Sequence, residues 1–196
     1  MKNVLIIGSP RAGKTTLSRL INQKLKYSII NLDDIVSAFQ VAHPQLGIRH
    51  DEDDNKVAAN FAPFLLAYLK ALSDGPNFYG DCKFVVEGTH IDFEKVISSI
   101  DKKKYLVLGL TYNETSSEEI YNNLKKHDTE DDWTYWSTED QLKEDVKYFI
   151  KRNSWFNKKF KEYDIKTFDT SKNREGILDN TIKYIEDNIN ELTPTV

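Results

Sequence analysis

A glycine-rich segment near the N-terminus constrains the fold of this chain more than any other feature. Residues 8–15 read Gly-Ser-Pro-Arg-Ala-Gly-Lys-Thr and follow directly after the apolar run Val4–Ile7. A strand that ends at Gly8 lets the loop turn its backbone N–H groups inward, and Gly13 lets the chain approach a ligand without a Cβ. Apolar residues then recur at helical spacing, at Leu17, Leu20, Ile21 and Leu25. The segment therefore predicts a strand, a phosphate-binding loop and a helix whose N-terminus faces the phosphates.

The residue types in this loop fit the pattern G-x-x-x-x-G-K-[ST], the Walker A motif, and an ordinary strand-to-helix turn is the alternative. In such a loop the lysine reaches the β- and γ-phosphate oxygens, and the hydroxyl reaches Mg²⁺. We assign these roles to Lys14 and Thr15 and expect ATP and Mg²⁺ as cofactors. The nucleotide contacts expected from the loop are Gly8, Ser9, Pro10, Arg11, Ala12, Gly13, Lys14, Thr15 and Thr16.

Composition and charge exclude several classes of protein. The 196 residues suffice for one domain with a full core, and no linker rich in proline, glycine or serine divides them. The net charge of -4 argues against broad binding of nucleic acid, and no apolar run approaches the roughly 20 residues that span a membrane. Cys82 is the only cysteine, which excludes an intramolecular disulfide and agrees with a reducing compartment. We expect a cytoplasmic protein with a small-molecule partner, and the oligomeric state stays open.

Short apolar runs alternate with stretches of helical periodicity, which is typical of a parallel α/β sheet. The expected strands are 4–7, 27–32, 84–86, 105–110 and 165–168. The expected helices after the first are 55–72, 92–100, 116–126, 139–163 and one that follows Ser171 and runs to about Ile189. The long stretch between the second and third strands is too long for a simple connection, so it should hold helices.

Carboxylates follow two of the expected strands. Glu87 ends the third strand, where a parallel sheet places it beside the phosphate loop and near Mg²⁺. Asp33 and Asp34 end the second strand. One of the two should cap the following helix. The alternative for Asp33 is that it accepts a proton from an attacking hydroxyl, or orients that hydroxyl.

Phosphoryl transfer also requires cations near the developing charge, and the chain has only five arginines. Arg11 lies inside the loop, and Arg19 is expected at the surface. Arg152 flanks the apolar stripe of a long helix, so it points either into a cleft or toward solvent. The remaining two are Arg49 and Arg174.

An acidic and aromatic segment, residues 127–138, separates two of the expected helices. Carboxylates that face a triphosphate repel it unless a metal intervenes, so the acidic side chains are expected to face water. The aromatic residues Trp133, Tyr135 and Trp136 either cover bound substrates or pack the segment down. We expect this segment to be a mobile flap.

The order of these parts resembles the adenylate-kinase-like branch of P-loop kinases, which includes nucleotide, shikimate, gluconate, zeta-toxin-type and 2-phosphoglycerate kinases. The Walker A match and the segment Val85–His90 carry the resemblance. It implies a three-layer fold with a five-stranded parallel sheet in the order 2-3-1-4-5. It further implies a substrate-binding insert at about 33–82 and a lid at about 127–138, within a single domain 1–196.

The resemblance also implies roles for single residues. Asp33 matches the aspartate that contacts the acceptor substrate, and Glu87 matches the magnesium-associated carboxylate. Asp169 and Ser171 fall in the loop that borders adenine, with Arg174 close by. For Ser171, an N-cap of the last helix is the alternative.

Two positions depart from the pattern of adenylate-type kinases, which hold the acceptor's phosphate with arginines. This chain has Val36 and His90 at those places, and neither can bind phosphate in the bidentate manner of arginine. Arg49 could supply one clamp from elsewhere in the insert. We therefore expect Asp33, Arg49, Glu87 and His90 to line the acceptor pocket.

The leading hypothesis is an ATP-dependent kinase that transfers the γ-phosphate to a hydroxyl of a small metabolite, such as a nucleoside or a sugar-like acceptor. Lys14 holds phosphates, Asp33 orients the hydroxyl, and Arg152 closes over the transferring group. A nucleoside monophosphate kinase and a non-catalytic, ATP-binding regulator are the alternatives.

Overall fold

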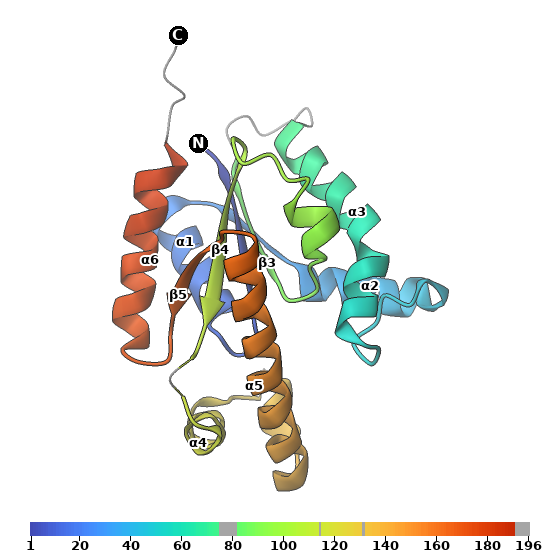
Figure 1. The fold of residues 1–196 in the computed structure, drawn as a ribbon, viewed down its shortest axis with the longest axis vertical. Coiled ribbons are helices and arrows are strands. Elements are labelled where there is room, and N and C mark those ends of the chain that lie inside the picture. The colour runs from blue at the N-terminus through green and yellow to red at the C-terminus, as the bar shows by residue number, and fades with distance from the viewer. Residues whose placement is uncertain (75–81, 114, 131, 191–196) are drawn as a thin grey trace.

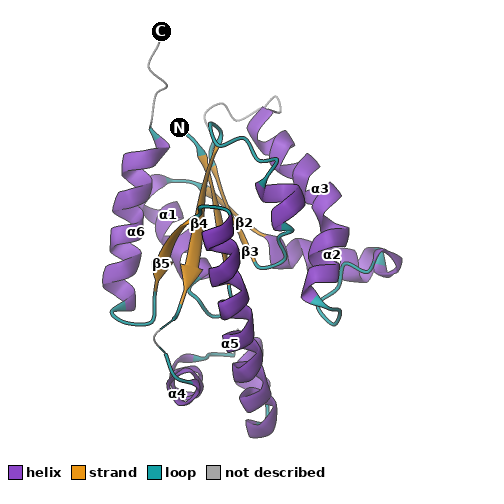
Figure 2. Ribbon diagram, viewed as in Figure 1, coloured by secondary structure: helices purple, strands orange, loops and turns teal. Residues whose placement is uncertain are grey.

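The computed structural model describes residues 1–74, 82–113, 115–130 and 132–190. A five-stranded, entirely parallel sheet lies at the centre, in the order β2-β3-β1-β4-β5 (Figure 2). The order predicted from the resemblance is confirmed. The strands are β1 (Asn3–Gly8), β2 (Ser28–Asn31), β3 (Phe84–Gly88), β4 (Tyr105–Thr111) and β5 (Lys166–Asp169).

Helices cover both faces of this sheet (Figure 1). They are α1 (Lys14–Leu25), α2 (Leu32–Ala42), α3 (Asp54–Asp74), α4 (Ser117–His127), α5 (Glu139–Glu162) and α6 (Arg174–Ile189). Short helical turns lie at η1 (Pro44–Leu46), η2 (Phe93–Ile97) and η3 (Trp133–Trp136). As predicted, the stretch between β2 and β3 contains helices. No helix among the described residues is long and apolar enough to cross a membrane.

Alternate side chains of the central strand β1 enter two separate cores, which is why the strand is apolar at every position from 4 to 7. Val4 and Ile6 pack with α1, α6 and the N-terminal half of α5. Leu5 and Ile7 pack with α2, α3, η2 and the C-terminal half of α5, which includes Phe160. The long helix α5 therefore contributes to both cores.

The parallel arrangement brings the carboxyl ends of all five strands to one edge of the sheet. Helix α4 and the N-terminal half of α5 extend past this edge (Figure 1). The phosphate loop follows β1 at the same edge, so the segment between α4 and α5 lies on the loop's side of the molecule. The fold thus gathers most of the expected site residues at one end.

Three local expectations from the sequence do not hold, one of which is the alternative given for Ser171. Neither Asp33 nor Asp34 caps α2; Asn31 does, since its side chain accepts a hydrogen bond from the Asp33 N–H at 2.8 Å. Asparagine at the last position of a strand is as good a cap as aspartate, so the helix begins earlier. The cap of α6 is Asn173 rather than Ser171.

The third error concerns the helix expected at 92–100, which is only the five-residue π-helical turn η2. Asp92 caps it and Phe93, Val96 and Ile97 are buried, so packing of a few apolar residues, not a full helix, produced the periodic pattern. The sequence also predicts that residues 73–76, Ser-Asp-Gly-Pro, end the helix expected at 55–72. Of these, Gly75 and Pro76 lie outside the described residues.

Candidate active site

The phosphate loop joins β1 to α1 through residues 9–13. Gly13 has a φ of +95°, and a Cβ built there would lie 3.1 Å from the Arg174 guanidinium. Arg11 also has a left-handed φ, of 66°. Because Gly13 is the cap of α1 and offers no side-chain hydrogen bond, the first N–H groups of the helix remain for a ligand. This geometry fits a bound phosphate chain.

Side chains from neighbouring strand ends fix the loop from behind. Thr170 donates to the Ala12 carbonyl at 3.1 Å, and Thr89 donates to the Gly8 carbonyl at 3.3 Å. The Ser9 hydroxyl lies 3.0 Å from the hydroxyl of Tyr112. The loop is therefore preorganised, since two of these contacts hold its carbonyl groups and the third holds the Ser9 side chain.

Lys14 and Thr15 begin α1 at the centre of the site. The Lys14 ammonium is buried and donates to the Ser9 carbonyl at 3.0 Å. Burial lowers its pKa, while the charges of Asp33 and Glu87 oppose that shift. An ammonium group has three donors, so Lys14 keeps donors for phosphate oxygens.

Thr15 donates to a carboxylate oxygen of Glu87 at 2.8 Å. Glu87 is buried, and this burial raises the pKa of its carboxyl, although Lys14 and Thr15 partly offset the shift. A hydroxyl and a carboxylate side by side are oxygen ligands of the kind that Mg²⁺ takes. The residues present therefore fit the expected cation.

A second group of side chains lies beside Lys14 and comes from three elements. His90, which follows β3, contacts Asp33 of α2 at 3.7 Å through Nδ1 and Asp54 of α3 at 3.3 Å through Nε2. Burial lowers the pKa of His90, but the two carboxylates outweigh burial, so the net shift is upward. Burial likewise opposes the charge on Asp33, yet His90 and Lys14 hold its pKa below the usual value.

Arg152 of α5 belongs to this same group and not to the solvent-exposed face of its helix. Its side chain is only 6% exposed, and its Nε lies 3.1 Å from a carboxylate oxygen of Asp54. The guanidinium lies over the ring of Trp155, with Cζ 4.1 Å from the centroid, and donates to Asn55 at 3.3 Å. Of the two orientations left open by the sequence, the structure excludes the one toward solvent.

We call Asp33, Asp54, His90 and Arg152 the acceptor-side group, and this group contains buried polar atoms without a hydrogen-bond partner. They are Asp33 Oδ1, His90 Nδ1, Arg152 Nε and Arg152 Nη2. Buried polar atoms are nearly always satisfied in folded proteins, so unsatisfied ones that cluster beside a phosphate loop indicate a binding site. One hydroxyl could donate to Asp33 and accept from His90, whose facing atoms are 3.7 Å apart.

The lid segment, residues 127–138, is joined to the phosphate loop by Arg11. Its guanidinium forms ion pairs with Asp128 and Asp132. Asp128 also accepts a hydrogen bond from Thr134, and its side chain is only 5% exposed. The prediction that the acidic side chains face water was therefore wrong for these two aspartates, because Arg11 supplies the opposite charge. Asp131 lies outside the described residues.

The aromatic residues of the lid segment are exposed, which favours neither of their two expected roles. Trp133, Tyr135 and Trp136 are 57%, 48% and 69% exposed. Trp133 contacts Phe149 edge-on, while Tyr135 and Trp136 contact each other.

The three residues expected to border adenine, Asp169, Ser171 and Arg174, stand between the end of β5 and the start of α6. Asp169 accepts from the Ser171 hydroxyl at 2.6 Å and from the Asn113 N–H at 3.1 Å. Arg174 donates to Thr16 at 3.3 Å and so lies over the phosphate loop. A cavity of about 240 Å³ opens between this loop and α4, lined by Thr115, Glu119, Asn122, Asn123, Ser171 and Lys172.

Arg49 does not join the acceptor-side group. It forms an exposed ion pair with Asp51, and no contact among the described residues connects it to Asp33 or His90. Val36, at one of the two positions of the absent arginine clamps, is fully buried in the core.

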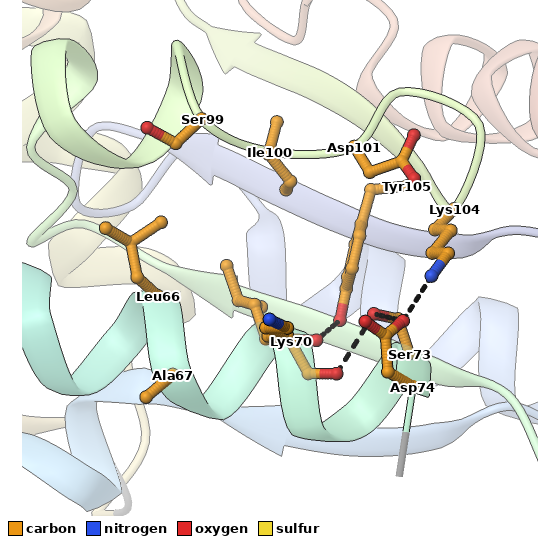
Figure 3. A pocket seen from close by; sticks show the side chains of 11 residues that line it. Leu66, Ala67, Lys70, Ser73, Asp74, Ser99, Ile100, Asp101, Lys104 and Tyr105 are labelled. Carbon is orange, nitrogen blue, oxygen red and sulfur yellow. Dashed lines mark hydrogen bonds and ion pairs between the residues drawn. The ribbon is translucent and has the colours of Figure 1, made fainter.

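A larger cavity, about 410 Å³, lies at the opposite end of the sheet from the phosphate loop, where β4 begins. Figure 3 shows Tyr105, Lys104 and Asp74 in its wall, with the Lys104–Asp74 ion pair across one side. The Tyr105 hydroxyl donates to the Leu69 carbonyl at 2.6 Å. None of the expected site residues lines this cavity. We therefore place the candidate site at the other end of the sheet, beside the phosphate loop.

Comparison of the structure with solved structures identifies the fold. A shikimate kinase from Bacteroides thetaiotaomicron superposes with a TM-score of 0.58 and 14% identity, covering 94% of this chain and 98% of that one. The chain has the P-loop kinase fold. The sequence itself matches no protein-family model and no curated protein.

Two further P-loop kinase structures are similar. A shikimate kinase from Acinetobacter baumannii in complex with shikimate gives a TM-score of 0.56 at 15% identity, covering 98% of this chain and 96% of that one. A gluconokinase from Sinorhizobium meliloti 1021 gives 0.56 at 12% identity, covering 95% and 92%.

Sequence reasoning missed two members of the candidate site, Asp54 and Tyr148. The Tyr148 hydroxyl donates to a carboxylate oxygen of Asp54 at 2.7 Å. Asp54 stands in the acidic run Asp51–Asp54 before a helix, which is indistinguishable from an ordinary capping sequence. The one feature of the sequence that could have indicated Asp54 is its position at the start of α3, because a side chain in the first turn of a helix can point toward the edge of the sheet.

Proposed function

We propose that this chain is an ATP- and Mg²⁺-dependent kinase that phosphorylates a hydroxyl of a small metabolite. The observation that carries the proposal is the position of Asp33. Its carboxylate is near enough to Lys14 for each to shift the pKa of the other, and it has an unsatisfied oxygen facing His90. A phosphate-binding lysine and a carboxylate with a free oxygen are the two parts that phosphoryl transfer to a hydroxyl requires.

In this proposal the chain's residues act mainly by position and charge. Lys14 and the loop amides bind the phosphates, while Thr15 and Glu87 hold Mg²⁺. Bound ATP supplies the phosphoryl group, and the cation neutralises charge on the phosphates. Asp33 accepts the proton of the acceptor's hydroxyl while the hydroxyl oxygen bonds to the γ-phosphorus. The bond between the γ-phosphorus and the bridging oxygen breaks, and ADP leaves with that oxygen.

The remaining residues exclude water and orient the acceptor. Arg152 and His90 contact the acceptor's oxygens rather than a phosphate of the acceptor. Arg11 couples the lid segment to the phosphate loop, and closure limits loss of the phosphoryl group to water. Asp169, Ser171 and Arg174 border the nucleotide, with the base in the 240 Å³ cavity beside α4.

The test is ADP formation from ATP and Mg²⁺ with a panel of hydroxyl metabolites, including shikimate and gluconate. Asp33→Asn should lower kcat with the best acceptor by at least about a hundredfold, the scale of a general base. Asp34→Asn is the matched control, because Asp34 is the exposed neighbour in the same helical turn. Equal loss in both variants, or no acceptor at all despite ATP binding, contradicts the proposal and favours a non-catalytic regulator.

A further inference from the structure

Arg152 carries the only guanidinium in the acceptor-side group, and the protein itself already neutralises it. Asp54 Oδ2 lies 3.1 Å from Arg152 Nε, and Tyr148 donates to the same carboxylate oxygen. Burial opposes the charge on Asp54, yet His90, Tyr148 and Arg152 hold its pKa below the usual value, so the carboxylate is ionised at neutral pH. Asp54 thus occupies the position next to Arg152 that an anionic ligand would take.

The formal charges of the acceptor-side group agree with the neutralisation of Arg152 by Asp54. Asp33 and Asp54 each carry one negative charge, and Arg152 carries one positive charge. His90, whose pKa is raised, adds a positive charge when protonated. These four side chains together are therefore neutral or negative, and a ligand carboxylate or phosphate held by them would remain uncompensated.

The unsatisfied atoms show what the group still can bind. Asp33 Oδ1 has no donor, and three nitrogens of the group, His90 Nδ1, Arg152 Nε and Arg152 Nη2, have no hydrogen-bond partner, although Asp54 lies 3.1 Å from Arg152 Nε. The side chain of Arg152 is more than nine-tenths buried, so its free donors are not satisfied by bulk solvent. Hydroxyl groups supply both a donor and an acceptor without charge.

Resting on the proposed function, we infer that the phosphate acceptor is an uncharged polyhydroxyl compound and that Asp54 sets this preference by neutralising Arg152. Asp54 is a positioning and specificity residue, because it acts through Arg152. Under this inference, acceptors that carry a carboxylate or a phosphate are poor substrates. In the metabolite panel, glucitol and similar polyols should exceed gluconate, which differs from glucitol by a carboxylate, at least tenfold in kcat/KM.

A direct test measures anion binding at Arg152 through the fluorescence of Trp155, which the guanidinium covers. The chain has three tryptophans, so Trp133→Phe and Trp136→Phe leave Trp155 as the only indole. Acetate is titrated against chloride at constant ionic strength, with and without Mg²⁺ and ADP. With Asp54 present, this protein should give no saturable change up to the highest acetate concentration used, and Asp54→Asn in the same protein should give a saturable change with a Kd at least tenfold below that concentration.

Two variants make the result specific. Asp53→Asn is the control, because Asp53 is exposed and caps α3 through an oxygen that asparagine retains. It should behave as wild type. Asp54→Ser replaces Asp54→Asn should the latter fail to fold.

The outcomes separate this inference from the proposed function. Failure of Mg²⁺ and ADP to bind refutes the kinase proposal but leaves the acetate result readable. Tight acetate binding to wild type, or no gain in a folded Asp54 variant, overturns the inference whether or not ADP binds. A best acceptor that carries a carboxylate or phosphate also overturns it, while leaving the kinase proposal intact.

Discussion

Lys14 is held in place by the loop that precedes it. Its ammonium is buried and donates to the Ser9 carbonyl at 3.0 Å, and Glu87 nearby is buried as well. A buried cation with spare donors is poised for an anion, because the binding geometry already exists before the ligand arrives. The phosphate affinity of the chain should therefore depend on this one side chain.

We expect Lys14→Met to reduce kcat/KM for ATP by about a thousandfold, the scale of losing one preorganised charged contact in the transition state. The thioether fills a similar volume without charge, so the fold should persist. Arg19→Met is the matched control, since Arg19 is an exposed cation on the same helix. Nucleotide binding by calorimetry together with ADP formation checks both variants, and comparable losses in the two would refute the assignment.

His90 should make stability depend on pH. Asp33 and Asp54 face its ring from α2 and α3, and His50 lies 5.9 Å away, centroid to centroid. Its pKa is raised above 6.5 in the folded state, so its stabilising contribution is complete below the unfolded pKa and is lost as pH rises through the folded pKa.

Urea unfolding of wild type and His90→Gln at about pH 5.5 and about pH 9 measures this effect. The difference in the free energy of unfolding should favour wild type at the acidic pH and shrink at the alkaline pH. A difference that is constant, or that grows with pH, would show that His90 is not stabilised in its charged form.

Single residues also show where sequence reasoning ends. The roles of Lys14 and Thr15 follow from the local motif alone, because chain neighbours build that geometry. Asp54 and Tyr148 meet from segments 94 residues apart. No local pattern specifies such a pairing, which the crossing of α3 and α5 creates.

At the scale of elements, the strands and major helices were predictable because buried parallel strands are apolar throughout and amphipathic helices are periodic. Helix starts were less predictable, since Asn31, Asp33 and Asp34 can all cap a helix. Which of them does so depends on the residue at which β2 ends, and that residue is Asn31. The lid segment was misjudged because Arg11, its partner, lies 117 residues earlier in the chain.

The ion pairs of Arg11 should hold the lid segment against the phosphate loop. Partly buried, charge-assisted contacts contribute about 1.5–3 kcal/mol, so Arg11→Met should increase the proteolysis rate within 127–138 about tenfold or more. Limited proteolysis with mass spectrometry measures the rate. Arg49→Met removes the exposed pair with Asp51 in the insert and should leave the lid segment unchanged. Equal rates in wild type and Arg11→Met would contradict the role of these pairs.

At the scale of the whole molecule, the docking of α5 on the sheet connects the core to the site. Phe160 lies against β4 at Gly109, where an added Cβ would come within 2.7 Å of the ring. Further along α5, Arg152 and Tyr148 reach the acceptor-side group. A change at this contact should therefore affect both stability and acceptor binding.

We expect Gly109→Ala to lower the free energy of unfolding by about 1–3 kcal/mol, because the buried ring cannot move aside. Phe160→Leu in the same chain should recover part of that loss by making room for the methyl group. Denaturant unfolding of both single variants and the double variant gives the coupling energy. Strictly additive effects would show that the two side chains do not meet.

The most direct measurement of the central claim is ³¹P NMR of ATP and Mg²⁺ incubated with the protein and a pool of uncharged polyols. The account predicts that the γ-phosphate signal decays and a phosphomonoester signal grows as ADP forms, with Asp33→Asn abolishing the growth. ATP that binds but stays intact, or that yields only inorganic phosphate, would contradict it.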